Sequence, residues 1–434
     1  MKILLIWPKV HNPIYEEFDP EKSLIYKILP KIVPFSKSLT FSILAGVTPE
    51  KHEIVLIEKP YQEIDFDIDA DVVAITCTTA SANMAYDIAD EFRKRGVFVT
   101  IGGYHPSALP KEAKEHADAV FIGEAEETWP QFLKDFENGK PKPFYEIMKP
   151  VSAENIPHQR NLYGNEGGFV IQATRGCPNR CEFCSISNMK FRHLFRTRDI
   201  DDVVDEIGSH PDKSFAFYDD SLTINPEYTK KLFKAITPLN KSFISYGNIN
   251  VLGKDEELLK LASDAGCSTW MIGFESVSPE SLQQSHKITN KVEIYEKHVR
   301  KVHEYGMSII GFFVFGLDGD TIDTFDKTTE MIDRCEIDAP TSFICTPLPG
   351  TPLFNRLDSQ GRIFTKDWSK YNLGHAVFQP KNMTPEELEY NAKRVHGEWY
   401  RFSNTTKRIL KNLKFGFKPM MSTTINNFFT KYPR

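Results

Sequence analysis

The residues of this 434-residue chain best suited to chemistry are three cysteines that fall within eight positions of one another. Cys177, Cys181 and Cys184 have the spacing C-x3-C-x2-C and follow an apolar run at 169–173 that favours a strand. Iron–sulfur clusters are normally held by four cysteine thiolates. Three thiolates therefore predict a cluster with one iron that lacks a protein ligand and is free to hold a chelating substrate.

Two other uses of these cysteines compete with a cluster. A structural zinc site normally has four ligands, and His193 is the candidate for the fourth. A disulfide framework is disfavoured because seven cysteines is an odd number and the N-terminus lacks the pattern of a secretory signal. The spacing favours the cluster. Its oxygen lability, with the unpaired cysteines, predicts a cytoplasmic protein in a cell that lives at least partly without oxygen.

Composition sets the remaining limits. With 41% hydrophobic residues the chain is long enough for two or three cores, and no apolar run approaches the ~20 residues of a membrane span. The formal net charge is −6, yet residues 391–434 hold ten Lys or Arg against one acid, Glu398. This basic tail, which carries Phe415, Phe417, Phe428 and Phe429, suits either a final helix that closes the fold or peripheral contact with an anionic membrane. The acidic body argues against nucleic-acid binding.

The chain divides into two strand–helix units. Residues 1–140 alternate strand patterns at 2–6, 53–57, 71–75, 98–101 and 119–122 with helix patterns at 82–95, 110–116 and 127–137. Such alternation predicts an α/β fold with a parallel, doubly wound (Rossmann-like) sheet. A linker with four prolines follows at 141–168. Small and hydroxyl residues stand at three strand ends of this unit (76–81, 102–107 and 123–127), which suits the close approach of a flat ligand.

The second unit, 169–350, resumes the alternation. Strands fit 169–174, 214–218, 243–247, 269–274, 308–315 and 341–346, with helices between them, and 351–434 is mostly helical. Six strand–helix units are too few for a closed eight-stranded barrel. Polar residues again follow the strands, so a second site is expected at the carboxyl ends.

The cysteine spacing after a first barrel strand resembles the signature of the radical S-adenosylmethionine (SAM) superfamily. The resemblance implies a partial (β/α)6 TIM-type barrel, a 4Fe–4S cluster whose open iron is chelated by SAM, and an electron donor such as flavodoxin or ferredoxin. Reductive cleavage of SAM then gives a 5′-deoxyadenosyl radical that removes hydrogen from a substrate. Carried onto this chain, the resemblance assigns SAM binding to Phe183, Asp219, Asp220, Asn248, Glu275, Gly311 and Gly316.

A second resemblance covers residues 1 to about 135. Gly-Gly-Tyr-His-Pro-Ser at 102–107 and Gly-Glu-Ala-Glu-Glu at 123–127 resemble the cobalamin (B12)-binding class of radical SAM enzymes. The motif Asp-x-His-x-x-Gly is absent, which implies a cobalamin without an axial histidine. The resemblance assigns cobalamin contacts to Thr78, Thr79, Gly103, Tyr104, His105, Gly123 and Glu124.

These patterns predict a cobalamin-dependent radical SAM enzyme that methylates an unactivated carbon of a small molecule. The aromatic content and the basic tail favour a lipid or a tetrapyrrole. Two alternatives stay open: ring closure or carbon–carbon coupling without methyl transfer, and a non-catalytic iron–sulfur or cobalamin sensor. The sequence indicates neither a catalytic acid or base nor an oligomeric state.

Overall fold

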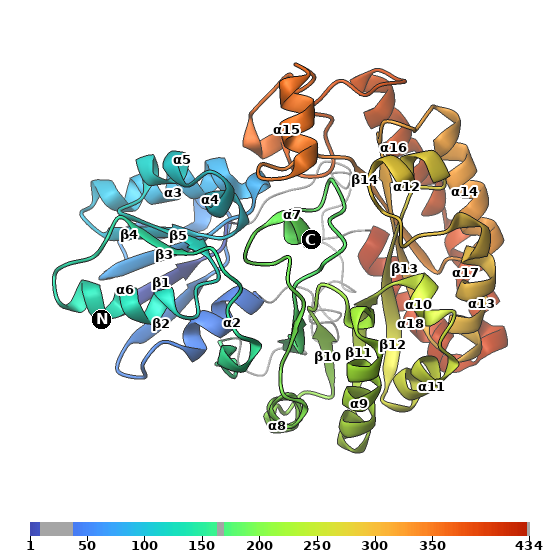
Figure 1. Ribbon diagram of the computed structural model, residues 1–434, viewed down its shortest axis with the longest axis horizontal. Coiled ribbons are helices and arrows are strands. Elements are labelled where there is room, and N and C mark those ends of the chain that lie inside the picture. Colours follow the sequence, from blue (N-terminus) through green and yellow to red (C-terminus); the bar gives the residue numbers. More distant parts are fainter. Residues whose placement is uncertain (9–37, 163–168, 432–434) are drawn as a thin grey trace.

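The computed structural model describes residues 1–8, 38–162 and 169–431. Two six-stranded parallel sheets form separate lobes, and Figure 1 shows the first sheet (blue) at the left and the second (green to orange) at the right. Both sheets are covered by helices, so the expected α/β class with a doubly wound sheet and a partial barrel is confirmed.

The first sheet has the strand order β2-β1-β3-β4-β5-β6. Its strands are β1 (Lys2–Ile6), β2 (Glu53–Ile57), β3 (Val72–Thr76), β4 (Phe98–Gly102), β5 (Ala119–Gly123) and β6 (Phe144–Ile147). Central strands β1, β3 and β5 are buried almost throughout, because helices lie on both faces. Helices α3 (Ala82–Lys94) and α5 (Pro110–His116) contribute to the core on one face. Helices α2 (Leu39–Gly46) and α6 (Thr128–Glu137) contribute to the core on the other.

Two elements of this lobe differ from the sequence-based expectation. Strand β6 lies within 141–168, which was predicted to be a linker, and pairs in parallel with β5. The strand has only four residues, lies between two prolines and is partly exposed at the edge of the sheet. Its sequence therefore shows almost no alternation of apolar and polar residues. Helix α2 is apolar along most of its length, so it lacks the polar face by which a surface helix is recognised. Residues 163–168 of the predicted linker lie outside the described residues.

The second sheet has the order β14-β13-β12-β11-β10-β7, with all neighbours parallel. Its strands are β7 (Phe169–Ile171), β10 (Ser214–Phe217), β11 (Ser242–Gly247), β12 (Cys267–Glu275), β13 (Ser308–Phe315) and β14 (Ala339–Ile344). The helices between them are α8 (Ile200–Ser209), α9 (Pro226–Ile236), α11 (Glu256–Asp264), α13 (Tyr295–Glu304) and α14 (Asp323–Cys335). Strands β7 and β14 stay unpaired with each other, so the barrel is open.

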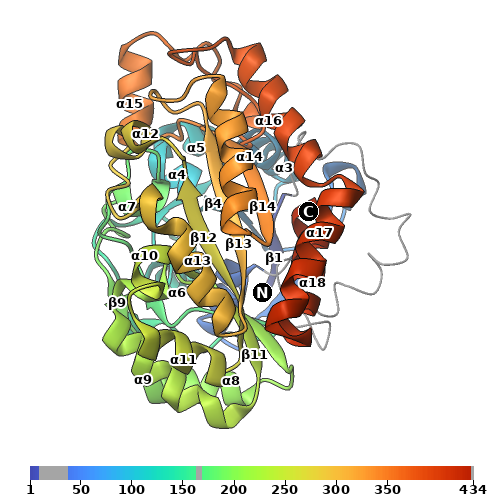
Figure 2. The same cartoon turned by 90° about the vertical axis from the view of Figure 1, so that its right-hand side faces the viewer.

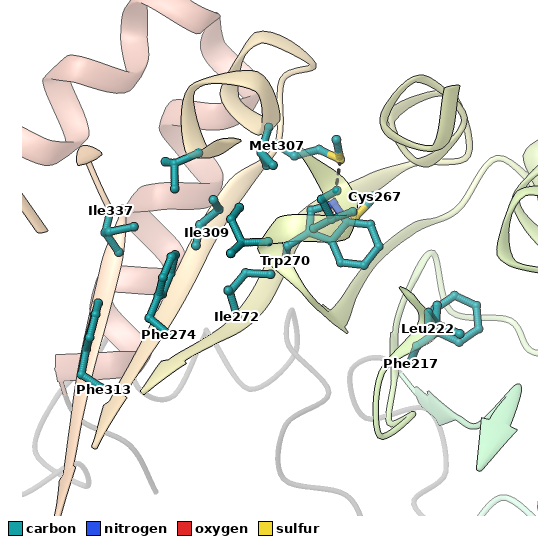
Figure 3. Close-up of a cluster of buried hydrophobic side chains, with 14 of the residues drawn as sticks. Phe217, Leu222, Cys267, Trp270, Ile272, Phe274, Met307, Ile309, Phe313 and Ile337 are labelled. Carbon is teal, nitrogen blue, oxygen red and sulfur yellow. Dashed lines mark hydrogen bonds between the residues drawn. The ribbon is translucent and has the colours of Figure 1, made fainter. Parts of the chain in front are cut away.

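The main core lies between the barrel strands and their outer helices. Figure 3 shows Trp270, Phe274 and Phe313 within this layer. The Trp270 indole N–H donates to the Met307 sulfur at 3.2 Å, which satisfies a polar group in an otherwise apolar environment. This layer fixes the strand positions, and with them the side chains at the strand ends.

The helical C-terminal region joins the lobes and closes the base of the barrel. Helix α15 (Pro352–Ser359) is followed by a segment that contacts α3, where the Asn83 amide donates to Asp367 at 2.9 Å. Helices α16 (Pro385–Trp399), α17 (Phe402–Asn412) and α18 (Phe417–Lys431) run down the barrel, as Figure 2 shows. The Thr423 hydroxyl of α18 donates to Asp338 at 3.1 Å, beside the amino end of β14. Among the described residues, no helix combines the length and hydropathy that crossing a membrane requires.

Candidate functional site

The carboxyl ends of both sheets open onto one cavity of about 880 Å³ between the lobes. One wall comes from β3, β4 and β5 with their following turns, and the other from the ends of the barrel strands with the cysteine loop (residues 176–184). The lining contains Cys177, Cys181 and Cys184 together with most of the other predicted site residues: Thr78, Gly103, Tyr104, Gly123, Glu124, Phe183, Asp219, Asp220, Asn248 and Glu275. A cavity of this size lies near the upper end of the roughly 300–1,000 Å³ typical of ligand pockets.

The cysteine loop is held by hydrogen bonds from residues beyond it. Cys177 N–H donates to the Arg192 carbonyl at 3.0 Å, and the Asn188 amide donates to the carbonyls of Cys181 and Cys184 at 2.8 Å each. Gly176 turns the chain at φ +94°, and a Cβ there would lie 2.1 Å from the Leu194 carbonyl oxygen. Only glycine fits this turn.

The donor set fits an iron–sulfur cluster better than a single metal ion. Burial raises the pKa of Cys177, and it raises the pKa of Cys181 to about 12. Both thiols would therefore have to release a proton when they bind iron as thiolates. Within the described residues, no three His, Cys, Asp or Glu side chains converge on one ion position. The His193 ring lies outside the cavity lining, with Nδ1 2.6 Å from the Lys190 carbonyl, so a zinc site with this histidine is not supported. Three soft donors facing one cavity suit a cluster with an open position.

The two aspartates after β10 support the cysteine loop. The Asp219 carboxylate accepts from the backbone N–H groups of Ala173, at 3.1 Å, and Thr174, and burial raises its pKa to about 7. The Asp220 carboxylate accepts from Gly176 N–H at 2.6 Å and from the Arg192 guanidinium at 3.0 Å. Both aspartates line the cavity, and their oxygens accept the hydrogen bonds that fold the loop.

Glu275 is held in a special conformation at the end of β12. Its φ of +65° coincides with a register shift between β12 and β13. Such a conformation in a residue other than glycine is strained and is often found at functional sites. The Glu275 carboxylate pairs with the Lys287 ammonium at 2.7 Å, and both line the cavity that holds the cysteines. Lys287 was missed by sequence reasoning because it lies in a loop after α12 (Pro279–Gln284), where no pattern marks it.

Two of the predicted SAM residues do not line the cavity. A Cβ at Gly311 would lie 2.9 Å from Ile337 Cγ2, and one at Gly316 would lie 2.6 Å from Leu388 Cδ2. These glycines permit close packing of the core and of α16. Asn248 does line the cavity, and its side-chain oxygen accepts from Asn250 N–H at 2.9 Å.

The wall from the first lobe is shaped by two glycines with positive φ. Gly103 has a φ of +113°, and a Cβ there would lie 2.5 Å from the Cys77 carbonyl oxygen. Gly123 has a φ of +97°, and a Cβ there would lie 2.0 Å from the Ile147 carbonyl oxygen. The Ser107 hydroxyl donates to the Gly103 carbonyl at 2.7 Å and accepts from Gly123 N–H at 3.1 Å. Backbone is therefore exposed to the cavity at Gly103 and Gly123, and the small side chain of Thr78 lies beside it, so this wall suits the face of a large flat ring.

Two predicted cobalamin contacts face away from this wall. His105 is 1% exposed, its Nε2 lies 3.1 Å from Glu112, and its Nδ1 lies 3.3 Å from the Thr79 hydroxyl. Neither His105 nor Thr79 lines the cavity, because α4 (Tyr104–Ala108) turns the histidine toward α5 and Trp368. Their role in this structure is to pack the lobe.

Glu124 joins the lobes. Its carboxylate receives two hydrogen bonds from Arg196, at 2.7 and 2.9 Å, and Arg175 and Arg192 lie 3.4 and 3.6 Å away. Burial alone would raise the pKa of Glu124, but the three arginines together hold it below its usual value. We call Glu124 and these arginines the interlobe cluster. Sequence reasoning missed the arginines because they lie 50 to 70 residues from their partner and form no local motif.

Comparison with known proteins agrees with both halves of the site. Residues 171–332 match the model of the radical SAM superfamily, and residues 43–133 match that of the B12-binding domain. The chain belongs to the radical SAM enzymes that carry a B12-binding domain. The expected cofactors, a 4Fe–4S cluster, SAM and cobalamin, are those of the families to which its two lobes belong.

The chain is 35% identical over 356 residues to bacteriochlorophyllide d C-12(1)-methyltransferase of Chlorobaculum tepidum, covering 78% of this chain and 76% of that one. It is 31% identical to bacteriochlorophyllide d C-8(2)-methyltransferase of the same organism, covering 86% and 88%. Among solved structures, the cobalamin-dependent radical SAM enzyme OxsB, with aqua-cobalamin and SAM bound, shares the fold with a TM-score of 0.66 at 15% identity. That match covers 99% of this chain and 72% of OxsB.

Proposed function

We propose that this protein transfers a methyl group to a carbon atom of a tetrapyrrole. The observation that carries the proposal is one cavity in which the cysteine loop and the strand ends of the first lobe at Gly103 and Gly123 face each other. Methyl transfer between the two cofactor sites needs such a shared space. The tetrapyrrole is favoured because two relatives, 35% and 31% identical, are named as bacteriochlorophyllide methyltransferases.

When bound, the cluster with SAM supplies the radical that removes hydrogen, and cobalamin supplies the methyl group. Cys177, Cys181 and Cys184 would hold the cluster. Glu275 would accept hydrogen bonds from the ribose hydroxyls of SAM. Lys287 beside it would supply a positive charge for the carboxylate of SAM. The backbone at Gly103 and Gly123 and the side chain of Thr78 would contact the corrin.

The inner wall of the barrel suits an apolar, planar substrate. Tyr246, Met271, Phe312 and Phe343 line the cavity there. The rings of Tyr246 and Phe312 lie 6.2 Å apart, and those of Phe312 and Phe343 lie 5.8 Å apart. Aromatic side chains offer flat apolar surface against which a macrocycle packs. Burial raises the pKa of Tyr246, so its phenol stays protonated and can donate a hydrogen bond.

The test is turnover by anaerobically purified protein loaded with iron, sulfide and cobalamin. SAM with a deuterated methyl group, a reductant and bacteriochlorophyllide d would be supplied, and the products analysed by mass spectrometry. We expect 5′-deoxyadenosine together with a tetrapyrrole that carries the deuterated methyl group. The proposed substrate class would be contradicted if the protein methylated none of a panel of tetrapyrroles but did methylate a lipid or another small molecule.

Ring closure is the second candidate, because the chain is 28% identical to the anaerobic magnesium-protoporphyrin IX monomethyl ester cyclase of Cereibacter sphaeroides. The match covers 74% of this chain and 58% of the cyclase. The same assay separates the two reactions, since ring closure forms 5′-deoxyadenosine without adding deuterium to the product. Absence of 5′-deoxyadenosine with every substrate would favour a non-catalytic sensor.

A further inference from the structure

The C-terminal helices present a row of exposed apolar side chains. Phe402 is 87% exposed, Leu410 60%, Leu413 53%, Phe417 70% and Met421 41%. Phe402 and Leu410 belong to α17 and Leu413 to the turn that follows it, while Phe417 and Met421 lie one turn apart at the start of α18. We call this row the C-terminal stripe. Single exposed apolar residues are common, whereas a row of five in twenty residues indicates an interaction surface.

The opposite side of the same segment is fixed to the barrel. Arg408 is 6% exposed and donates to the Asn427 side chain at 2.8 Å and to the Trp399 carbonyl at 2.7 Å. Asn412 donates to the buried Asp338 carboxylate at 2.5 Å. Because these contacts set the rotation of α17, the stripe cannot turn inward to bury itself.

The charged residues of the segment itself are all basic. Between Tyr400 and Lys431 the sequence has six Lys or Arg and no acid. Lys407 lies 3.4 Å from Asp333, and Lys411 and Lys414 share Glu336 at 3.3 and 2.6 Å. These pairs are partly exposed and therefore weak, so the lysines remain available to anions.

We propose that the C-terminal stripe docks this protein on an anionic lipid surface. Exposed apolar side chains on a pair of helices, flanked by lysines, suit helices that lie in the plane of a membrane. Two copies of this chain joined through the stripe would bring like charges together, so the charge favours lipid over self-association. Figure 1 shows α17 at the side of the barrel remote from the first sheet, and no residue of the stripe lines the cavity between the lobes, so docking there leaves the cavity uncovered.

The experiment is co-sedimentation of the loaded holoenzyme with vesicles of phosphatidylcholine, with and without about one third phosphatidylglycerol. We expect binding to the anionic vesicles that weakens with salt, and a loss of about ten-fold or more in the triple variant Phe402→Ser, Leu410→Ser and Phe417→Ser. Phe364→Ser is the matched control, because Phe364 is 56% exposed on another part of the surface. Thermal unfolding and iron content of each variant establish that it is folded.

Three outcomes would overturn the proposal: no binding of wild-type protein to anionic vesicles, equal binding by the triple variant, or a dimer that the triple variant loses without any vesicle binding. The proposal is independent of the reaction, since SAM cleavage in the absence of vesicles should be unchanged in the triple variant. If wild-type protein transferred no methyl group, that result would therefore count against the proposed function and not against docking.

Discussion

At the scale of single residues, the site is built from buried charges that are each committed to a partner. Asp219 and Asp220 hold the cysteine loop, and Glu275 is paired with Lys287. In a low-dielectric cavity such pairs fix side-chain positions before any ligand arrives. Substitutions here should therefore separate residues that bind a cofactor from residues that only shape the loop.

Cys177→Ala, Cys181→Ala and Cys184→Ala should each abolish the cluster and, with it, SAM cleavage, since each removes one of only three thiolates. Iron and sulfide content and 5′-deoxyadenosine formation are the measurements. Cys335→Ala is the control, because Cys335 is buried in the barrel core away from the cavity. A motif variant with full iron content and full SAM cleavage would contradict the assignment.

Glu275→Gln should weaken SAM binding while the cluster stays intact. A hydrogen bond to a charged group contributes about 1.5–3 kcal/mol, which corresponds to roughly 10- to 150-fold in the dissociation constant. The measurement is equilibrium binding of SAM to the reconstituted protein under anaerobic conditions. Glu280→Gln serves as the control, because Glu280 is an exposed residue of α12. An unchanged dissociation constant for Glu275→Gln would mean that the carboxylate only pairs with Lys287.

At the scale of elements, what matters is how the strand ends of the two lobes are tied together. The interlobe cluster links the turn after β5 to both sides of the cysteine loop, through Arg175 before it and Arg192 and Arg196 after it. The Glu124 carboxylate also accepts from Val151 N–H at 2.8 Å, which anchors the segment that leaves the first lobe.

Glu124→Gln should destabilise the fold by about 3–5 kcal/mol, because it removes the carboxylate that pairs with the largely buried Arg196 guanidinium. Denaturant unfolding gives the free energy, and proteolysis within 141–168 reports separation of the lobes. Because the folded-state pKa of Glu124 is lowered, its contribution to stability is present above the unfolded-state pKa and is lost as pH falls through the folded-state value. Glu127→Gln, an exposed neighbour, should change neither measurement. Equal stability of Glu124→Gln and wild type would show that the cluster does not tie the lobes.

Sequence reasoning succeeded where the signal was local. The cysteine spacing and the polar residues after each strand are read from neighbouring positions, and their placement around one cavity follows from the parallel sheets. It failed where orientation or pairing depends on the fold. His105 sits within a glycine-rich motif yet points away from the cavity, and Lys287 meets Glu275 only because a loop returns across the barrel mouth. Neither fact is encoded at a fixed sequence spacing.

At the scale of the whole molecule, the cavity has two walls of different character, one from each lobe. The wall from the first lobe contains backbone that tolerates no side chain, so Gly103 and Gly123 are poor sites for a test: any substitution would clash with the lobe itself. Thr78 is exposed and lines the cavity, so a larger residue there can extend into the ligand space.

Thr78→Phe should block cobalamin binding while leaving the iron content and SAM cleavage largely intact. The lost N-terminal cap of the following turn costs only about 1 kcal/mol, which would not unfold the lobe. Uptake of hydroxocobalamin is measured by absorbance, alongside 5′-deoxyadenosine formation. Met148→Phe, at an exposed position that is not part of the cavity lining, is the control. Stoichiometric cobalamin in Thr78→Phe would place the corrin elsewhere.

The interlobe cluster also bears on how such proteins diversify. Two lobes joined by a linker invite the view that each is an exchangeable module. Here the acid belongs to one lobe and its three arginines to the other. A chimaera that combines this first lobe with an unrelated barrel would leave Glu124 buried without a counter-charge, and the reciprocal chimaera would take the first-lobe carboxylates away from Arg175 and Arg196. Recombination between relatives should therefore be tolerated only where acid and arginines are inherited as a set.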